Sequence, residues 1–128
     1  METAKTFKIG RTILKKIEFY EPEDFNISNY NVSTLPEFTE DRRDMRMLTS
    51  IEITNETNVI LSVELYIYFY LLEDYQVISK NNEEYRNMIR LCFIELDYFI
   101  HTIFRNTSHG IEFKLDIDGM LEESGSDS

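Results

Sequence analysis

The segment that most constrains this chain is residues 59–72, VILSVELYIYFYLL, in which two kinds of side chain alternate. Its odd positions, from Val59 to Leu71, are all aliphatic or phenylalanine. Three of its even positions are tyrosines, namely Tyr66, Tyr68 and Tyr70. Because successive side chains of a β-strand point to opposite faces of a sheet, the segment predicts a strand with one apolar and one aromatic face.

Two earlier segments also have strand patterns. Residues 7–19 carry apolar side chains at one parity, and Arg11 and Lys15 interrupt that face. A weaker strand is expected over residues 29–38, at an edge of the sheet because Pro36 has no N–H to contribute to a ladder. The sequence thus predicts a first strand with a mixed face and a second strand at an edge.

A β-hairpin is predicted next. Residues 45–54 alternate between apolar and polar side chains, and the turn-forming tetrapeptide NETN separates them from residues 59–72. Short connections of this kind join antiparallel strands, so the expected sheet has about four antiparallel strands.

After the hairpin, the apolar residues follow the period of a helix. From Asn82 to Asn106 they recur every three or four positions, and Gly110 suits the left-handed conformation that commonly ends a helix. Several apolar residues lie off the main stripe, namely Leu91, Phe93, Ile94 and Phe104. A helix that is apolar on more than one side has more apolar surface than one sheet can cover, and this predicts self-association.

The last part of the chain returns to an alternating pattern. Residues 111–118 are expected to be extended, and the DIDG sequence at residues 116–119 is expected to form a turn. Residues 1–121 are expected to form a single domain, and the polar residues 122–128 a disordered tail.

Charge and cysteine content narrow the function classes. The net charge is −11, whereas binding to nucleic acid or to anionic membranes needs clusters of Lys and Arg, so neither partner is expected. Cys92 is the single cysteine, which rules out an internal disulfide and indicates a reducing compartment. Because residues 1–10 contain no apolar signal segment, a cytoplasmic location is predicted.

Catalytic and metal-binding patterns are weak. His101 and His109 have no Cys or carboxylate at metal-ligand spacing around them. Cys92 lies on the apolar stripe of the helix, which favours a buried residue over a nucleophile. The DIDG sequence lacks the later ligands of a calcium loop. The protein is therefore expected to be neither an enzyme nor a cofactor- or metal-binding protein.

The three tyrosines allow two interpretations. In the first they stabilise cross-strand pairs on a half-exposed sheet face. In the second they form an aromatic surface for protein recognition, in which Tyr is enriched. The residue pattern alone does not choose between them.

The first strand and the residues after it carry a pattern at fixed spacing, made of Ile9, Arg11, Lys15, Ile17, Phe19 and Pro22. This pattern resembles the opening strand of the SecB family, the tetrameric protein-export chaperones. The order of elements also agrees, with an irregular aromatic-bearing crossover at residues 20–38, a hairpin at 45–72 and then one long helix. The resemblance covers roughly residues 7–120, and the segment from Phe99 into residues 111–117 is similar to the end of the family's long helix and the extended run after it.

The resemblance implies an α+β fold, with a four-stranded antiparallel sheet followed by one long helix, assembled as a dimer of dimers. It also implies a homotetrameric holdase that binds unfolded polypeptides in hydrophobic grooves without ATP. The implied client-binding residues are Phe25, Ile27, Tyr30, Leu35, Phe38, Phe93, Phe99 and Phe104.

A second surface is implied on the outer side of the sheet, where the family docks the translocase motor SecA through acidic residues. The matching positions here are Lys16 and Tyr20, which are not acids. The expected partner-docking residues are the nearby acids and the tyrosines: Glu18, Glu21, Glu23, Glu64, Tyr66, Tyr68 and Tyr70.

The chain departs from the family at its end, because the family has a second helix where this sequence is expected to have none. This departure and the missing acids favour an alternative, a SecB-like protein dedicated to one partner, as an inhibitor or in a toxin–antitoxin system.

Overall fold

A computed structural model describes most of the chain, namely residues 7–20, 27–39, 44–56, 58–72, 82–105 and 115–125. Its elements in chain order are β1 (Phe7–Phe19), β2 (Asn29–Phe38), β3 (Asp44–Thr54), β4 (Val59–Leu71), α2 (Asn82–Arg105) and α3 (Ile117–Gly125). The predicted α+β class, a four-stranded antiparallel sheet followed by a helix, is confirmed.

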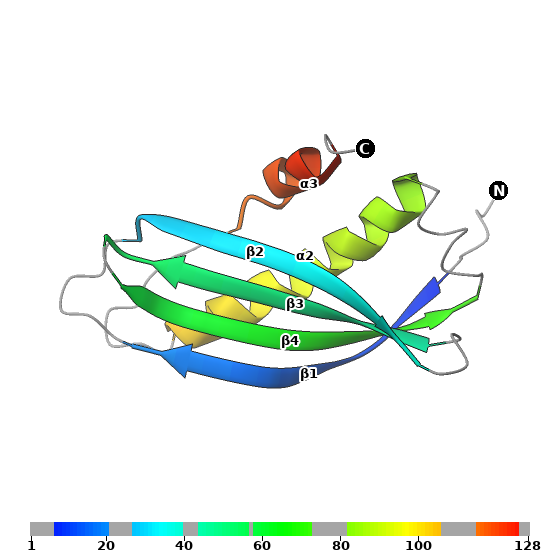
Figure 1. Ribbon diagram of the computed structural model, residues 1–128, viewed down its shortest axis with the longest axis horizontal. Coiled ribbons are helices and arrows are strands. Elements are labelled where there is room, and N and C mark those ends of the chain that lie inside the picture. The colour runs from blue at the N-terminus through cyan, green and yellow to red at the C-terminus, as the bar shows by residue number, and fades with distance from the viewer. Residues whose placement is uncertain are drawn as a thin grey trace.

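The sheet has the strand order β1-β4-β3-β2, and every neighbouring pair is antiparallel. The predicted hairpin is the pair β3 and β4, and the predicted edge strand is β2, which carries Pro36. The helix α2 runs diagonally across one face of the sheet, and α3 lies beside it above the β2 side (Figure 1). We call the face turned away from α2 the outer face.

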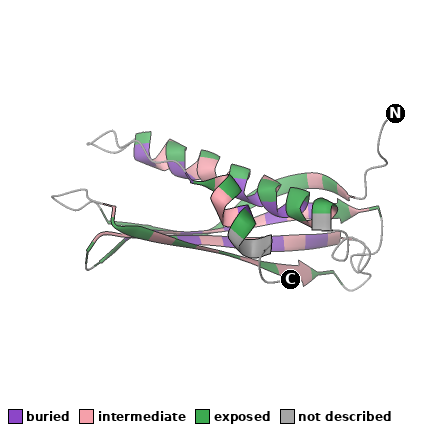
Figure 2. Ribbon diagram, turned by 90° about the horizontal axis from the view of Figure 1, so that it is seen from above, coloured by how far each residue is buried: buried purple, intermediate pink, exposed green. Residues whose placement is uncertain are grey.

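The hydrophobic core lies between the sheet and α2. The odd-numbered residues of β4 from Leu61 to Phe69 are fully buried, and so are Met88, Cys92 and Leu96 of the helix. The tyrosines of β4 have the opposite parity, and they are half-buried or exposed. The predicted alternation is therefore confirmed from Leu61 to Tyr70, and Figure 2 shows the buried positions between the two layers. It fails at the start of the strand, where Val59 is exposed and Ile60 is buried because the register with β3 shifts there.

The first strand contains two irregularities in its pairing with β4. Gly10 and Arg11 together stand opposite Tyr68, and Lys15 and Lys16 together stand opposite Glu64. Each extra residue reverses the parity of the strand from that point on. An added Cβ at Gly10 would lie 2.9 Å from the Tyr70 ring, so a larger residue at the first bulge would displace that ring.

The bulges correct the prediction of a mixed face for β1. By register, Thr12 and Leu14 face α2, and the Thr12 hydroxyl donates a 3.3 Å hydrogen bond to Glu95 Oε2 of that helix. Arg11 and Lys15 lie instead over tyrosine rings of the outer face. A parity count that ignores the extra residues places these two cations on the wrong side.

Most of the apolar residues that lie off the main stripe of α2 are buried or half-buried within the single chain. Phe104 is fully buried, Phe93 is 5% exposed and Leu91 is half-buried, whereas Ile94 is 45% exposed. The helix packs on the sheet with one side and toward α3 with another. Its surplus of apolar residues therefore belongs largely to the core of one chain, and the surplus alone no longer requires self-association.

The end of the chain differs from the prediction. Residues 117 and 118 are helical and not extended, and residues 122–125 belong to α3 and not to a disordered tail. Leu115 and Leu121 are buried in the core. The sequence was expected to lack the family's second helix, and this expectation is wrong, because a short helix of 9 residues is present there.

Local polar contacts explain why this helix forms. The Asp116 carbonyl accepts a hydrogen bond from the Met120 N–H at 2.9 Å, and its carboxylate accepts one from the Gly119 N–H at 3.2 Å. A side chain that accepts from these first N–H groups caps a helix. The DIDG sequence is therefore the start of a helix and not an isolated turn. None of the described helices combines the length and hydropathy that a bilayer span requires.

Candidate functional site

A cleft lies where β2, α2 and the start of α3 meet. Its volume is about 510 Å³, and its lining residues are Asn29, Tyr30, Asn31, Val32, Phe93, Asp116, Gly119 and Met120. Binding pockets in proteins typically measure roughly 300–1,000 Å³. The cleft therefore has the size of a binding site for a small molecule or for a few residues of a peptide.

The apolar part of the cleft comes from all three elements. Tyr30 and Val32 stand opposite Ile53 and Ile51 of β3, so they face the helix side of the sheet. Phe93 comes from α2 and Met120 from α3. Aromatic rings supply a large contact area, and a Met side chain adapts its shape to different neighbours, which suits apolar ligands of varied shape.

Polar contacts fix the wall that α3 contributes. The Asp97 carboxylate of α2 accepts a 3.0 Å hydrogen bond from the Leu115 N–H, and the Tyr30 hydroxyl accepts one from the Asp116 N–H at 3.4 Å. Arg90 and Asp118 form an ion pair of 3.0 Å between α2 and α3. The start of α3 is thus held to both the helix and the edge strand.

Removing the Asp97 contact should loosen this wall. In an Asp97→Ala variant the Leu115 N–H loses a charged acceptor, and we expect the free energy of unfolding to fall by about 1–3 kcal/mol. Hydrogen exchange should show faster exchange at the Leu115 amide. Asp97→Asn keeps an acceptor oxygen and serves as the control. Equal protection of that amide in the wild type and in Asp97→Ala would contradict the assigned role.

The structure separates the predicted client-binding residues. Tyr30 and Phe93 line the cleft together. Ile27 and Phe99 pack against the core, Phe104 is fully buried with its ring 6.4 Å from that of Phe19, and Phe38 is exposed at the end of β2. Phe25 lies outside the described residues.

Leu35 is a correction to this set. It stands opposite Leu48 and has the opposite parity to Tyr30, so it lies on the outer face and not in the groove. Sequence reasoning also missed Val32, Asp116 and Met120. The alternation of the strand could have predicted Val32, because this residue lies two positions after Tyr30 and therefore faces the same side of the sheet.

Most of the predicted partner-docking residues lie on the outer face, as expected. The register places Glu18, Glu64, Tyr66, Tyr68 and Tyr70 there, and Glu21 and Glu23 lie outside the described residues. A shared face is all that the register establishes for these residues, and their role in docking stays a prediction.

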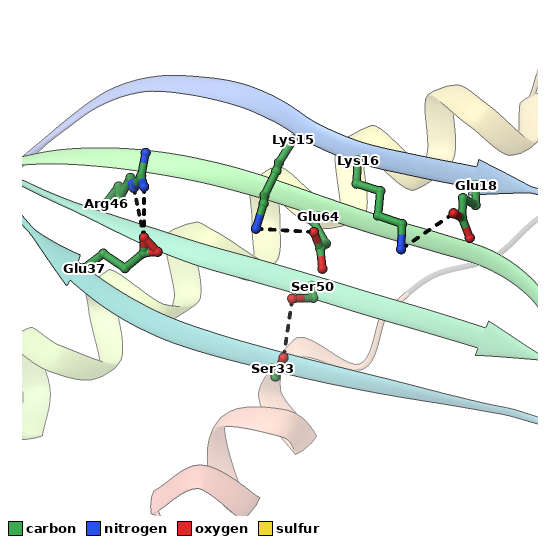
Figure 3. A network of polar contacts seen from close by, with 8 residues as sticks. All are labelled: Lys15, Lys16, Glu18, Ser33, Glu37, Arg46, Ser50 and Glu64. Carbon is green, nitrogen blue, oxygen red and sulfur yellow. Dashed lines mark hydrogen bonds and ion pairs between the residues drawn. The ribbon is translucent and has the colours of Figure 1, made fainter.

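Cations cover two of the tyrosine rings. The guanidinium of Arg46 lies 3.9 Å from the centre of the Tyr66 ring and the Lys15 ammonium 5.3 Å from it, while Arg11 lies 5.1 Å from the Tyr68 ring. Carboxylates hold two of these cations, because Arg46 pairs with Glu37 at 3.0 Å and Lys15 with Glu64 at 3.7 Å (Figure 3). Such contacts agree with the cross-strand interpretation of the tyrosines.

The described residues contain no group of three or more His, Cys, Asp or Glu side chains that could hold a metal ion. The His101 Nε2 atom lies 3.7 Å from the Asp97 carboxylate, and His109 is outside the described part. Cys92 is fully buried, and burial raises the pKa of its thiol to about 12, although a hydrogen bond with Thr49 opposes the shift. A thiol with this pKa is protonated at neutral pH and is a poor nucleophile.

The Cys92 pKa predicts a specific alkaline destabilisation. Below the ordinary thiol pKa of 9.0 the folded and unfolded states are both protonated, and pH has no effect through this group. Between pH 9.0 and about 12 the unfolded state alone releases the proton, so stability falls by up to about 1.4 kcal/mol per pH unit. Urea titrations between pH 8 and 10.5 measure this loss. Cys92→Ala should show a shallower decline, and an identical decline would contradict the assignment.

Comparison with known proteins adds no family assignment, since neither a family model nor a curated protein matches this sequence. The resemblance to the SecB family therefore depends on the first-strand residues and on the order of elements.

Proposed function

We propose that this protein is an ATP-independent holdase of the SecB type, which binds non-native polypeptide segments in the cleft between β2, α2 and α3. The observation that carries the proposal is that the cleft joins an edge strand to apolar side chains from three elements. Among the described strands, β2 pairs with β3 alone.

An edge strand beside a cleft that contains apolar side chains suits a ligand of variable sequence. An extended peptide can add to a sheet edge through backbone hydrogen bonds, which are the same for every sequence. Alternate side chains of that peptide would then point toward Tyr30, Val32 and Phe93. Adaptable apolar surfaces are typical of proteins that bind many partners. Backbone pairing would thus supply affinity, and the cleft would favour segments rich in apolar residues.

A second candidate is a dedicated binder of one protein. It is favoured by the polar share of the cleft lining, because Asn29, Asn31 and Asp116 carry directional hydrogen-bonding groups. Groups of this kind reject ligands that leave them unpaired. The same fold would then protect or inhibit a single partner.

An aggregation assay separates the two candidates. Several unrelated denatured proteins are diluted into buffer with near-stoichiometric amounts of the chain, and light scattering is followed over time. A holdase should slow the aggregation of all of them without ATP. Protection of one protein alone would support the dedicated binder, and protection of none would contradict the holdase proposal.

A pair of variants of one strand locates the binding site. Tyr30→Ser removes a ring from the cleft, and we expect client affinity to fall about tenfold, the effect of roughly 1–2 kcal/mol that interface truncations often have. Leu35→Ser removes an apolar side chain from the other face of β2 and should leave client affinity unchanged. Fluorescence anisotropy with a labelled unfolded peptide measures both. Equal affinities for the two variants would place the site elsewhere.

A further inference from the structure

The outer face carries a row of apolar side chains that crosses the whole sheet. In order from β1 to β2 the row is Ile13, Tyr66, Leu48 and Leu35, each directly opposite the next. Its two ends are accessible, with Ile13 36% and Leu35 57% exposed. Arg46 and Lys15 lie over the Tyr66 ring, and no described helix covers this face, so the two apolar ends of the row are open to a partner.

Charged rows flank the apolar row on both sides. One contains Arg11, Tyr68, Arg46 and Glu37, and the other contains Lys15, Lys16, Glu64, Ser50 and Ser33. Figure 3 shows members of both rows on the near side of the sheet, with α2 behind it.

Charge is unevenly spread across the outer face. The β1 margin carries four cations, Lys8, Arg11, Lys15 and Lys16, against one carboxylate, Glu18. The half formed by β3 and β2 carries three carboxylates, Asp44, Glu37 and Glu52, against one cation, Arg46. Within the described part of the chain, neither Lys8 nor Arg11 lies within ion-pair distance of a carboxylate. One margin is therefore basic and the opposite half is acidic.

The described outer face should repel a second copy less than the net charge of the chain suggests. The chain has a net charge of −11, so most approaches of two copies bring like charges together. The charges of the described outer face balance. Arg46 and the four cations of the β1 margin make five cations, and Asp44, Glu37, Glu52, Glu18 and Glu64 make five carboxylates.

We propose that two copies of this chain pack outer face against outer face, about a two-fold axis parallel to the strands. Rotation about that axis lays the β1 margin of one copy over the β2 margin of the other. The apolar rows of the two copies then face each other, with Ile13 over the partner subunit's Leu35 and Tyr66 over the partner subunit's Leu48. In the neighbouring row, Arg11 faces the partner subunit's Glu37. Aligned packing of two sheets is a common arrangement in proteins.

The charge pattern selects this axis over the other axis in the plane of the sheet. A two-fold axis along the apolar row would lay the β1 margins over each other. Arg11 would then face Lys15 and Lys16 of the partner subunit, and like charges at close range are strongly unfavourable. An axis parallel to the strands is the one that brings opposite charges together.

Mixing two charge-reversal variants tests the contact. In Arg11→Glu alone, and in Glu37→Arg alone, both copies of the contact pair like charges. We expect the dimer dissociation constant of each variant to rise roughly tenfold or more over the wild type. An equimolar mixture should recover dimerisation, because each mixed dimer pairs opposite charges at both contacts. Sedimentation velocity of the full chain measures this, and circular dichroism checks that each variant is folded.

The mixture also separates the contact from effects within one chain. Glu37→Arg loses its pair with Arg46 in every sample, so that loss cannot produce recovery on mixing. Failure of the mixture to recover would overturn the proposed arrangement. So would a wild-type chain that stays monomeric across micromolar concentrations.

A second pair of variants tests the apolar row without charge reversal. Leu35→Lys should weaken the dimer by a similar factor, whereas Val59→Lys should not, because Val59 lies at the hairpin end of β4, outside the row. Equal dimerisation of these two variants would overturn the proposal. The cleft proposed for client binding lies on the other face of the sheet, so the aggregation assay should be unaffected by any of these changes. The two proposals can thus fail independently.

Discussion

Replacing Phe69 with Ala should lower the free energy of unfolding by about 3–5 kcal/mol, the range found for large-to-small changes in protein cores. Phe69 is fully buried on the helix side of β4, and the edge of one ring meets the face of the other in its contact with Phe7, with ring centres 5.5 Å apart. The loss combines the transfer energy of the ring with the cavity left between the sheet and α2. Urea denaturation followed by circular dichroism measures it.

The adjacent residue provides the control. Tyr68→Thr keeps the preference for a strand and removes a ring from the outer face, with its contacts to Arg11 and Arg46. Exposed cation–π contacts contribute only about 0.5–1 kcal/mol, so the cost should stay within about 1 kcal/mol. Similar losses for the two variants would mean that the faces of β4 are wrongly assigned.

Phe93→Asp should strongly destabilise the packing of α2 on the sheet. The side chain is 5% exposed, and an aspartate there must either lie uncharged or carry an unpaired charge into the core. We expect the free energy of unfolding to fall by more than the roughly 3–5 kcal/mol that a Phe-to-Ala substitution costs in a protein core. Thermal unfolding measures it, and a folded variant with unchanged melting temperature would contradict the packing described for Phe93.

Ile94→Asp is the matched control, one residue away on the exposed side of the helix. Ile94 is 45% exposed, so the protomer should lose less than about 1 kcal/mol. The dimer of dimers implied by the resemblance puts a seam on this side of α2. We expect no change in mass, because the outer-face dimer does not involve Ile94, and a loss of mass on substitution would favour the helix-side seam.

Local periodicity was enough to predict most of the fold. The alternation in β4 and the three- to four-residue spacing in α2 each depend on neighbours within one segment, and both elements lie where they were expected. The NETN turn and Pro36 fixed the hairpin and one edge of the sheet by local rules of the same kind.

The parts that sequence could not predict depend on other segments. The bulges of β1 exist because Gly10 with Arg11, and Lys15 with Lys16, meet single residues of β4, and no pattern inside β1 reveals that pairing. The short α3 was mistaken for extended chain. Its apolar residues Ile117, Met120 and Leu121 are too few to show a helical period on their own.

The candidate site was predicted only in outline. Tyr30 and Phe93 were named as binding residues, and they do meet in one cleft. Met120 and Asp116 could not be foreseen, because they reach the cleft through a helix that was not expected. Leu35 was misplaced for a different reason, since aromatic and aliphatic content was counted across β2 without applying its parity.

The bulged strand has a consequence for how the protein avoids aggregation. An exposed sheet edge can template the addition of further strands, and bulges and lysines are known ways to prevent this. β1 carries two interruptions of its ladder and three lysines, so a foreign strand cannot extend along its full length in one register. β2 has only Pro36 to interrupt it. If the protein binds misfolded segments along β2, the bulges and lysines of β1 would prevent further strands from adding at the opposite edge.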